Sequence, residues 1–342
     1  MFKKIIALTS SLALSTFFLT GCNSNIEVKD KKIDKITIAE VTHSVFYAPQ
    51  YVAISKGFFE DEGIKVDLIN TQGADKTMAA LISGEAQIGL MGPEASIYVY
   101  NQGNNDYAIN FAQLTKRDGS FIMSREKIKN FSYDNLKGKE MLGGRKGGMP
   151  LMTLEYMLKQ KGLTIGENTN NGNINLRTDV QFGVIAGAFA AGEADFATVF
   201  EPTATQIEKE GAGYIVASVG QDSGEIPFTA YSTTKSYMSK NKDLIQRFTN
   251  ALYKSQQWVQ SASNEEIAKA MKPFFDDTSL NDLISVVDRY KSIDAWSYDP
   301  LLTEESLNNL INVMEDAHEL DKKPQYNAIV NTEFATNAIN NK

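Results

Sequence analysis

The stretch LISGEAQIGLMGPEAS (residues 81–96) decides the fold, because the chain repeats it as AFAAGEADFATVFEPTA (residues 188–204). Aligning the two copies matches Gly84 with Gly192. In each copy the apolar spacing predicts a helix that ends at the glycine, then a short buried strand, then a helix that begins at a proline. The chain therefore builds the same small unit twice.

Strands and helices also alternate around the first copy. Residue patterns predict strands at 35–40 and 65–69, and Asp75 is expected to cap the next helix. That helix is expected to bury a face formed by Met78, Ala79, Leu81 and Ile82. Such alternation favours parallel sheets, whose ligands bind beyond the carboxyl ends of the strands. The sequence thus predicts an α/β protein of two lobes, each a mainly parallel sheet flanked by helices, with a ligand cleft between them.

The chain is expected to cross between the lobes twice. Residues 110–117 lead out of the first lobe, residues 120–125 enter the second, and residues 226–231 return. A long amphipathic helix is predicted at 242–260, and two further helices lie around 281–290 and 303–320. These C-terminal helices are expected to pack on the first lobe.

The N-terminus predicts export. Two lysines followed by a short apolar run are typical of a signal peptide, here residues 1–21, and the run is too short to span a bilayer comfortably. Leu19-Thr20-Gly21-Cys22 resembles the lipobox of bacterial lipoproteins, which implies lipid attachment at Cys22 and a polar tether over residues 22–33. The alternative is an ordinary signal followed by a free cysteine. We expect a protein exported and lipid-anchored to the outer face of the bacterial cell membrane.

Composition excludes several classes of function. Cys22 is the only cysteine in 342 residues, so the processed chain offers no disulfide, thiolate nucleophile or cysteine-based metal cluster. The formal charge of −8 argues against nucleic-acid binding. His318 lacks the spacing of a His-Glu-x-x-His metal site, and no histidine partner is evident for the serine of residues 221–224, QDSG. We therefore expect no catalytic residue, no metal and no cofactor.

Short motifs across most of the chain carry a family resemblance. They are YAPQYVA (47–53), KGFF (56–59), EGIKV (62–66), GEAQIG (84–89), LKGK (136–139) and GEAD (192–195). In this order and spacing they resemble the solute-binding proteins of bacterial ABC importers that serve thiamine-pyrimidine precursors, sulfonates, taurine and nitrate. Each motif is weak alone, and together they are specific to the family but not to a ligand.

The resemblance implies a periplasmic-binding-protein type II fold. Its lobes would comprise residues 34–117 with 229–342 and residues 118–228, and would close by hinge motion. It also implies capture of a small organic molecule and delivery to ABC permease subunits in the membrane, by a protein that we expect to be a monomer. Two other classes stay open, a pyrimidine-precursor synthase-like enzyme and a ligand sensor. The synthases of this fold use a cysteine-rich motif, which this chain lacks.

The ligand is expected to contact loops at the carboxyl edges of both sheets and residues near the hinge. Aromatic rings there are expected to stack on a flat ligand, although Phe46 is equally well a core residue. Glycines ahead of Pro150 can offer N–H groups to an oxygen-bearing ligand group, the alternative being a plain turn. The candidates are His43, Ser44, Phe46, Tyr47, Asp75, Gly92, Glu94, Gly147, Gly148, Met149, Gln181, Phe182, Glu201 and Tyr231.

Charge indicates the ligand class. The repeat sets Pro93-Glu94 opposite Glu201-Pro202, so both carboxylates are expected to face the cleft and hold an amine or amidine-like group. Two such carboxylates would repel a bare anion, which favours an amine-bearing heterocycle such as a thiamine pyrimidine precursor. A zwitterion such as taurine stays open, as do the sulfonates and nitrate. The competing explanation is structural, since helix N-termini attract glutamate.

Overall fold

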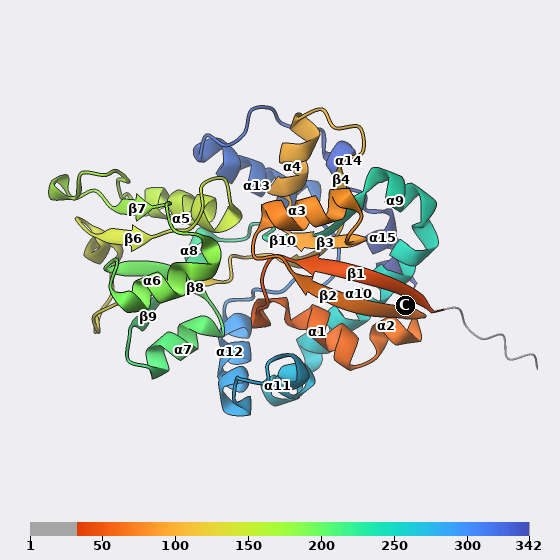
Figure 1. Cartoon of the computed structure of the whole chain (residues 1–342), viewed down its shortest axis with the longest axis horizontal. Coiled ribbons are helices and arrows are strands. Elements are labelled where there is room, and N and C mark those ends of the chain that lie inside the picture. Colours follow the sequence, from red (N-terminus) through yellow and green to blue (C-terminus); the bar gives the residue numbers. More distant parts are fainter. Residues whose placement is uncertain (1–32, 342) are drawn as a thin grey trace, which may run out of the picture. The chain divides into compact units, whose positions relative to one another are not determined.

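Two five-stranded sheets organise the computed structural model, which describes residues 33–341. The predicted signal peptide, Cys22 and nearly all of the tether lie outside these residues. In lobe 1 the strand order is β2-β1-β3-β10-β4, and in lobe 2 it is β7-β6-β8-β5-β9 (Figure 1). The strands of lobe 1 are β1 (Asp34–Glu40), β2 (Ile64–Asn70), β3 (Ile88–Met91), β4 (Ala108–Thr115) and β10 (Thr229–Thr234). Those of lobe 2 are β5 (Ser120–Ser124), β6 (Glu140–Leu142), β7 (Asn175–Arg177), β8 (Phe196–Phe200) and β9 (Tyr214–Ser218).

Both sheets are mainly parallel, and each contains one reversed strand. β1, β2 and β3 pair in parallel, whereas β10 is antiparallel to both β3 and β4. Likewise β6, β7 and β8 pair in parallel, and β5 is antiparallel to both β8 and β9. The reversed strand is in each case the first one after the chain enters or re-enters that lobe. The two lobes therefore share one topology, which extends the repeat seen in the sequence to whole sheets.

Helices flank the sheets, as predicted. In lobe 1, α3 lies on one face of the sheet and α1, α2 and α10 lie on the other (Figure 1). The α-helices before the first crossing are α1 (Ala48–Ser55), α2 (Phe58–Asp61), α3 (Ala74–Ser83) and α4 (Glu94–Asn101). Lobe 2 contains α5 (Met149–Gln160), α6 (Ile185–Ala191), α7 (Thr203–Lys209) and α8 (Val219–Ser223). After β10 come α9 (Lys235–Lys240), α10 (Lys242–Ser261), α11 (Asn264–Met271), α12 (Leu280–Ser292), α13 (Glu304–Asp316), α14 (Tyr326–Ile329) and α15 (Glu333–Asn340).

Five short 3-10 helices complete the described part of the chain. They are η1 (Val45–Tyr47), η2 (Tyr133–Leu136), η3 (Thr169–Asn171), η4 (Phe182–Val184) and η5 (Lys272–Phe274). Within residues 33–341, the structure contains no helix whose length and apolar character would let it cross a membrane.

The repeated unit has the predicted local structure in both lobes. α3 ends at Gly84 with φ of 80°, and α6 ends at Gly192 with φ of 95°. Both values lie in the left-handed region, where a side chain is strained and glycine is favoured. The buried strands β3 and β8 follow directly, and α4 and α7 begin just after Pro93 and Pro202.

The details of α3 differ from the prediction. The N-cap is Gly73 rather than Asp75, and no side chain caps the helix there. Asp75 lies in the first turn, and its carboxylate forms an ion pair with Arg145 instead. The buried face is also rotated, because Ala79 is exposed and Ile82 is 44% exposed. The residues that α3 does bury are Thr77, Met78, Ala80 and Leu81.

The long predicted helix is α10, which packs its apolar face on lobe 1. Phe248 lies 4.9 Å from the ring of Phe59 and 5.7 Å from that of Phe111, measured between centroids. α15 packs against α10 and β4, so the C-terminus covers the lobe where the described chain begins. One large apolar cluster lies mainly in lobe 1 and reaches Phe121, Met149 and Met152 of lobe 2, and smaller clusters lie in both lobes.

The two crossings between the lobes lie side by side. The backbone N–H of Phe228 donates to the carbonyl of Thr115 at 3.1 Å, and Ile226 donates likewise to Lys116 at 3.0 Å. The hydroxyl oxygens of Thr115 and Thr229 are 2.7 Å apart. The lobes are thus joined by two short, mutually bonded segments.

Candidate functional site

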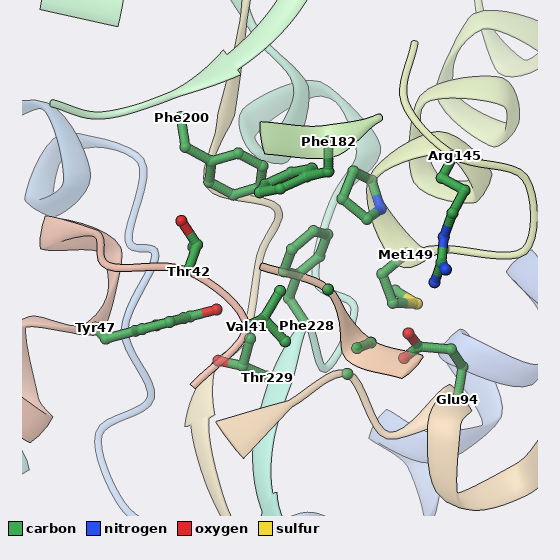
Figure 2. Close-up of a pocket in the computed structure, with 15 residues that line it drawn as sticks. Val41, Thr42, Tyr47, Glu94, Arg145, Met149, Phe182, Phe200, Phe228 and Thr229 are labelled. Carbon is green, nitrogen blue, oxygen red and sulfur yellow. The ribbon is translucent and has the colours of Figure 1, made fainter. Parts of the chain in front are cut away.

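A cavity lies between the lobes at the carboxyl ends of β1 and β3, and Figure 2 shows the residues around it. Lobe 1 and the return crossing contribute Val41, Thr42, Tyr47, Gly73, Ala74, Gly92, Glu94, Phe228 and Thr229. Lobe 2 contributes Arg145, Gly148, Met149, Pro150, Phe182 and Phe200. The position matches the expectation for open α/β sheets, where loops that follow the strands surround a ligand.

Aromatic rings form much of the cavity wall. The ring centroids of Phe182 and Phe200 are 5.8 Å apart, and those of Phe200 and Phe228 are 6.1 Å apart. Tyr47 approaches from the other lobe and directs its hydroxyl into the centre of the view (Figure 2). Walls of this kind, with few polar groups, are typical of sites for small organic molecules.

Glu94 is the buried acid of the cavity. It is 2% exposed, and its Oε2 atom has no hydrogen-bond partner. Burial raises the pKa of its carboxyl to about 8, opposed by Arg145 and by hydrogen bonding with the backbone of Met149 and Ala95. The carboxyl is therefore mostly uncharged at neutral pH. An uncharged, incompletely bonded carboxyl at a cavity wall is available to a ligand that offers both a donor and an acceptor.

The glycine beside Glu94 leaves room for the carboxyl in its present position. A Cβ atom on Gly92 would lie 1.9 Å from Oε2 of Glu94, far inside van der Waals contact. Gly92 therefore gives the carboxyl its space at the end of β3. The repeat in the sequence pointed to Gly92 and Glu94 together, and the structure brings both to the cavity.

Arg145 is a charged lining residue that was not among the candidates from the sequence. It belongs to the glycine-rich loop before α5, and its guanidinium pairs with the carboxylate of Asp75 at 2.8 Å. The sequence predicted ligand contacts from the backbone of that loop, and Gly148 and Met149 of the loop line the cavity. Gly147 does not line it; its carbonyl accepts a hydrogen bond from the Tyr98 hydroxyl at 3.0 Å. The position of Arg145 within the glycine-rich run of residues 143–148 is the sequence signal that could have identified it.

A second, more polar chamber adjoins the first and shares Thr42, Phe182 and Phe200 with it. His43, Ser44 and Glu201 line this second chamber rather than the first. The structure therefore distributes the predicted residues over two neighbouring spaces, with Phe182 between them.

His43 is held by the protein itself. Its Nδ1 lies 3.0 Å from Oε1 of Glu40, and its Nε2 lies 2.7 Å from the carbonyl oxygen of Phe274. Its ring stacks on Phe275 with 4.7 Å between centroids. The hydrogen bond to Glu40 raises the pKa of His43, while partial burial opposes that shift. Both ring nitrogens are occupied, so a ligand in the second chamber would meet the edge of an already bonded imidazole.

Glu201 lines the second chamber and does not share the first cavity with Glu94. It is 1% exposed, and its carboxylate forms an ion pair with Arg289 of α12. Both carboxylate oxygens also accept hydrogen bonds from Thr205, at 2.9 and 3.0 Å. Burial raises the pKa of Glu201, while Arg289 and Thr205 oppose that shift. The charge that was expected to hold a ligand cation is therefore neutralised inside the protein.

Three further candidates lie away from both chambers. Phe46 is fully buried among Tyr47, Phe200, Phe228 and Tyr290, so it belongs to the core. Tyr231 is fully buried in β10 and donates its hydroxyl hydrogen to Gln50. Gln181 is exposed at the start of η4 and lines neither chamber. Aromatic residues beside strand ends give the same sequence pattern whether their side chains point into a core or into a cleft.

Solved structures share the fold. The ligand-binding component of an ABC-type import system from Staphylococcus aureus superimposes with a TM-score of 0.69 at 17% identity, covering 89% of this chain and 99% of that one. The alkanesulfonate-binding protein SsuA from Xanthomonas axonopodis pv. citri gives 0.67 at 15% identity, covering 88% and 99%. An enzyme, the desulfurization enzyme DSZB, gives 0.64 at 12% identity, covering 90% and 99%. These likenesses establish the two-lobed periplasmic-binding-protein fold.

Sequence comparison gives the family. The chain is 44% identical over 326 residues, 95% of each protein, to the candidate binding protein YtlA of Bacillus subtilis (strain 168). The NMT1-like family matches residues 34–272, which is well over half of the chain. The chain therefore belongs to the NMT1-like family.

Proposed function

We propose that this protein is the extracytoplasmic substrate-binding protein of an ABC importer. It captures a small organic molecule in the cavity around Glu94 and delivers it to permease subunits in the membrane. The observation that carries the proposal is a cavity lined by both lobes, in which aromatic rings surround a buried carboxyl with one unbonded oxygen. Loops of both lobes would enclose the ligand when residues 34–117 with 229–342 close on residues 118–228.

An amine-bearing heterocycle is the ligand class that this cavity favours. Its ring would pack against Phe182, Phe200 and Phe228, and its N–H groups would bond to the free Oε2 of Glu94. An uncharged carboxyl can also donate its hydrogen to a ring nitrogen, so an aminopyrimidine would satisfy both atoms at once. A thiamine pyrimidine precursor is such a molecule. Glu94 is the one carboxyl that favours an amine ligand here, because Glu201 is paired with Arg289.

A sulfonate-type ligand is the second candidate, and Arg145 favours it. The guanidinium lines the cavity beside the N-terminus of α5, and both attract an oxyanion. Asp75 already pairs with Arg145, which weakens this attraction.

Ligand titration of matched variants separates the candidates. Thermal-shift and calorimetric titrations with aminopyrimidines, alkanesulfonates, taurine and nitrate would use the wild type, Glu94→Gln, and Glu85→Gln as the control, since Glu85 is exposed far from the cavity. An amine ligand predicts roughly 10- to 100-fold weaker binding for Glu94→Gln only. Tight binding of a sulfonate that Glu94→Gln leaves unchanged, or strengthens, would contradict the amine proposal.

The cellular setting is part of the proposal. The protein is proposed to be exported, lipid-attached at Cys22 and monomeric. The signal-like N-terminus and the lipobox resemblance support export and lipid attachment, which would keep the protein beside its permease. Mass spectrometry of the mature protein would reveal a diacylglyceryl mass increase at Cys22. A membrane sensor that uses the same cleft is distinguished by deleting this protein while the permease stays in place. Uptake of the ligand is then lost if the chain serves an importer, and is unaffected if it serves a sensor.

A further inference from the structure

The buried ion pair of Glu201 is not used by the proposed ligand site, so it calls for another role. Glu201 follows β8 in lobe 2, and its partner Arg289 lies on α12, which packs against α11 and η1 of lobe 1. The pair therefore joins the two lobes. Its acid is 1% exposed, and separating a buried pair leaves an uncompensated charge in the interior.

Neighbouring groups add to this junction. The backbone N–H of Glu201 donates to the hydroxyl of Tyr290 at 3.1 Å, and that hydroxyl donates to the carbonyl of Gly119 at 3.0 Å. Gly119 belongs to the first crossing between the lobes. From lobe 1, the Ser44 hydroxyl donates to the carbonyl of Glu201. Every one of these side chains is buried apart from Arg289, which is 29% exposed.

The opposite side of the cleft is joined differently. There the Asp75 carboxylate of lobe 1 pairs with the Arg145 guanidinium of lobe 2 at 2.8 Å, with side chains 54% and 40% exposed. The Tyr98 hydroxyl also donates to the carbonyl of Gly147 at 3.0 Å, and Lys159 of α5 pairs with Asp316 of α13 at 2.8 Å, with side chains 37% and 33% exposed. An exposed pair of this kind contributes little, because water replaces its interactions at small cost. The ion pairs on the two sides of the cleft thus differ in burial, and the exposed ones are the easier to separate.

We propose that the Glu201–Arg289 junction is a buried, non-covalent connection between the lobes that stays intact while the cleft opens on the side of Asp75 and Arg145. Glu201 is then a pivot residue rather than a ligand residue. The inference concerns the cleft of the proposed binding protein, but it rests on contacts between the lobes and not on any ligand.

The opening direction can be measured without a ligand. With Cys22→Ser, a single introduced thiol becomes the only one in the chain, and its reaction rate with N-ethylmaleimide reports how often its surroundings open. Met149→Cys reports on the first cavity, where Met149 is 2% exposed. Val199→Cys reports on the second chamber beside Glu201, where Val199 is 7% exposed.

Each reporter is combined with one of two matched substitutions. Asp75→Asn breaks the exposed pair with Arg145. Asp282→Asn breaks the pair between α12 and Lys209, whose nitrogen lies 2.5 Å from the Asp282 carboxylate, with side chains 54% exposed for Lys209 and 18% for Asp282. We expect Asp75→Asn to accelerate labelling of Met149→Cys about two- to fivefold, the range of an exposed ion pair, and to leave Val199→Cys unchanged. Asp282→Asn should change neither rate.

Three outcomes would overturn the proposal. They are acceleration of Val199→Cys by Asp282→Asn, equal acceleration of both reporters by Asp75→Asn, and no acceleration of either reporter. All three concern the motion alone. If the protein bound no solute, the proposed function would be refuted, but the labelling rates would still report how the lobes open.

Discussion

Replacing Glu94 by Gln tests whether the cavity acid is as deeply buried as the structure shows. Its pKa of about 8 lies some 3.5 units above the ordinary value of 4.5. At 1.36 kcal/mol per unit, the difference corresponds to roughly 5 kcal/mol, an upper estimate. Below about pH 4.5 the acid is protonated in both the folded and the unfolded chain, so it contributes nothing unfavourable there. As the pH rises towards 8, only the unfolded chain ionises, and folding stability falls.

Urea unfolding at pH 5, 6, 7 and 8 measures this directly. The free energy of unfolding of the wild type should fall relative to that of Glu94→Gln by up to about 1.4 kcal/mol per pH unit, approaching roughly 5 kcal/mol by pH 8. If the new amide changes the free energy of unfolding by the same amount at every pH, the difference in pH dependence between the two proteins is unaffected. Glu85→Gln, the same substitution at an exposed site, should run parallel to the wild type. Parallel curves for Glu94→Gln and the wild type would refute the burial of this carboxyl.

Two further predictions concern the crossing between the lobes. Asp118 is fully buried there, and burial raises its pKa to about 7 from 3.8. In the same urea experiment the wild type should lose stability between pH 4 and 7, by at most about 4 kcal/mol, and Asp118→Asn should not. A variant whose stability depends on pH as the wild type's does would contradict this. Gly220→Ala should lower the melting temperature by several degrees, because the new Cβ would lie 2.0 Å from the Asp118 carbonyl oxygen. Gly187→Ala, in α6 with open space around it, should raise the melting temperature slightly. Equal effects of the two substitutions in calorimetry would contradict the predicted clash at Gly220.

The architecture was accessible from the sequence because it depends on local signals that occur twice. Gly84 and Gly192 end helices in the left-handed conformation, and the buried strands and prolines that follow repeat in order. The one reversed strand in each sheet was not foreseen. β5 follows β4 without an intervening helix, so helix alternation carries no information about its direction.

Six candidates from the sequence line the first cavity, two of them the aromatic residues Tyr47 and Phe182. Gly92, Glu94, Gly148 and Met149 lie at strand ends or at a helix start, and all four line the cavity. The pairing of Glu201 with Arg289 was not predictable, because it joins residues 88 positions apart through tertiary packing. Phe46 and Tyr231 lie in the core, and the sequence could not show this because apolar periodicity does not distinguish a cleft wall from a core.

The most direct test of the central claim is to identify what the cavity holds. Small molecules released by mild denaturation of protein purified from its own host would be identified and quantified by mass spectrometry, in parallel for the wild type and Glu94→Gln. The account predicts a heteroaromatic amine at close to one molecule per chain in the wild type, and a large loss of it in Glu94→Gln. A sulfonate or nitrate retained equally by both proteins would contradict the role assigned to Glu94.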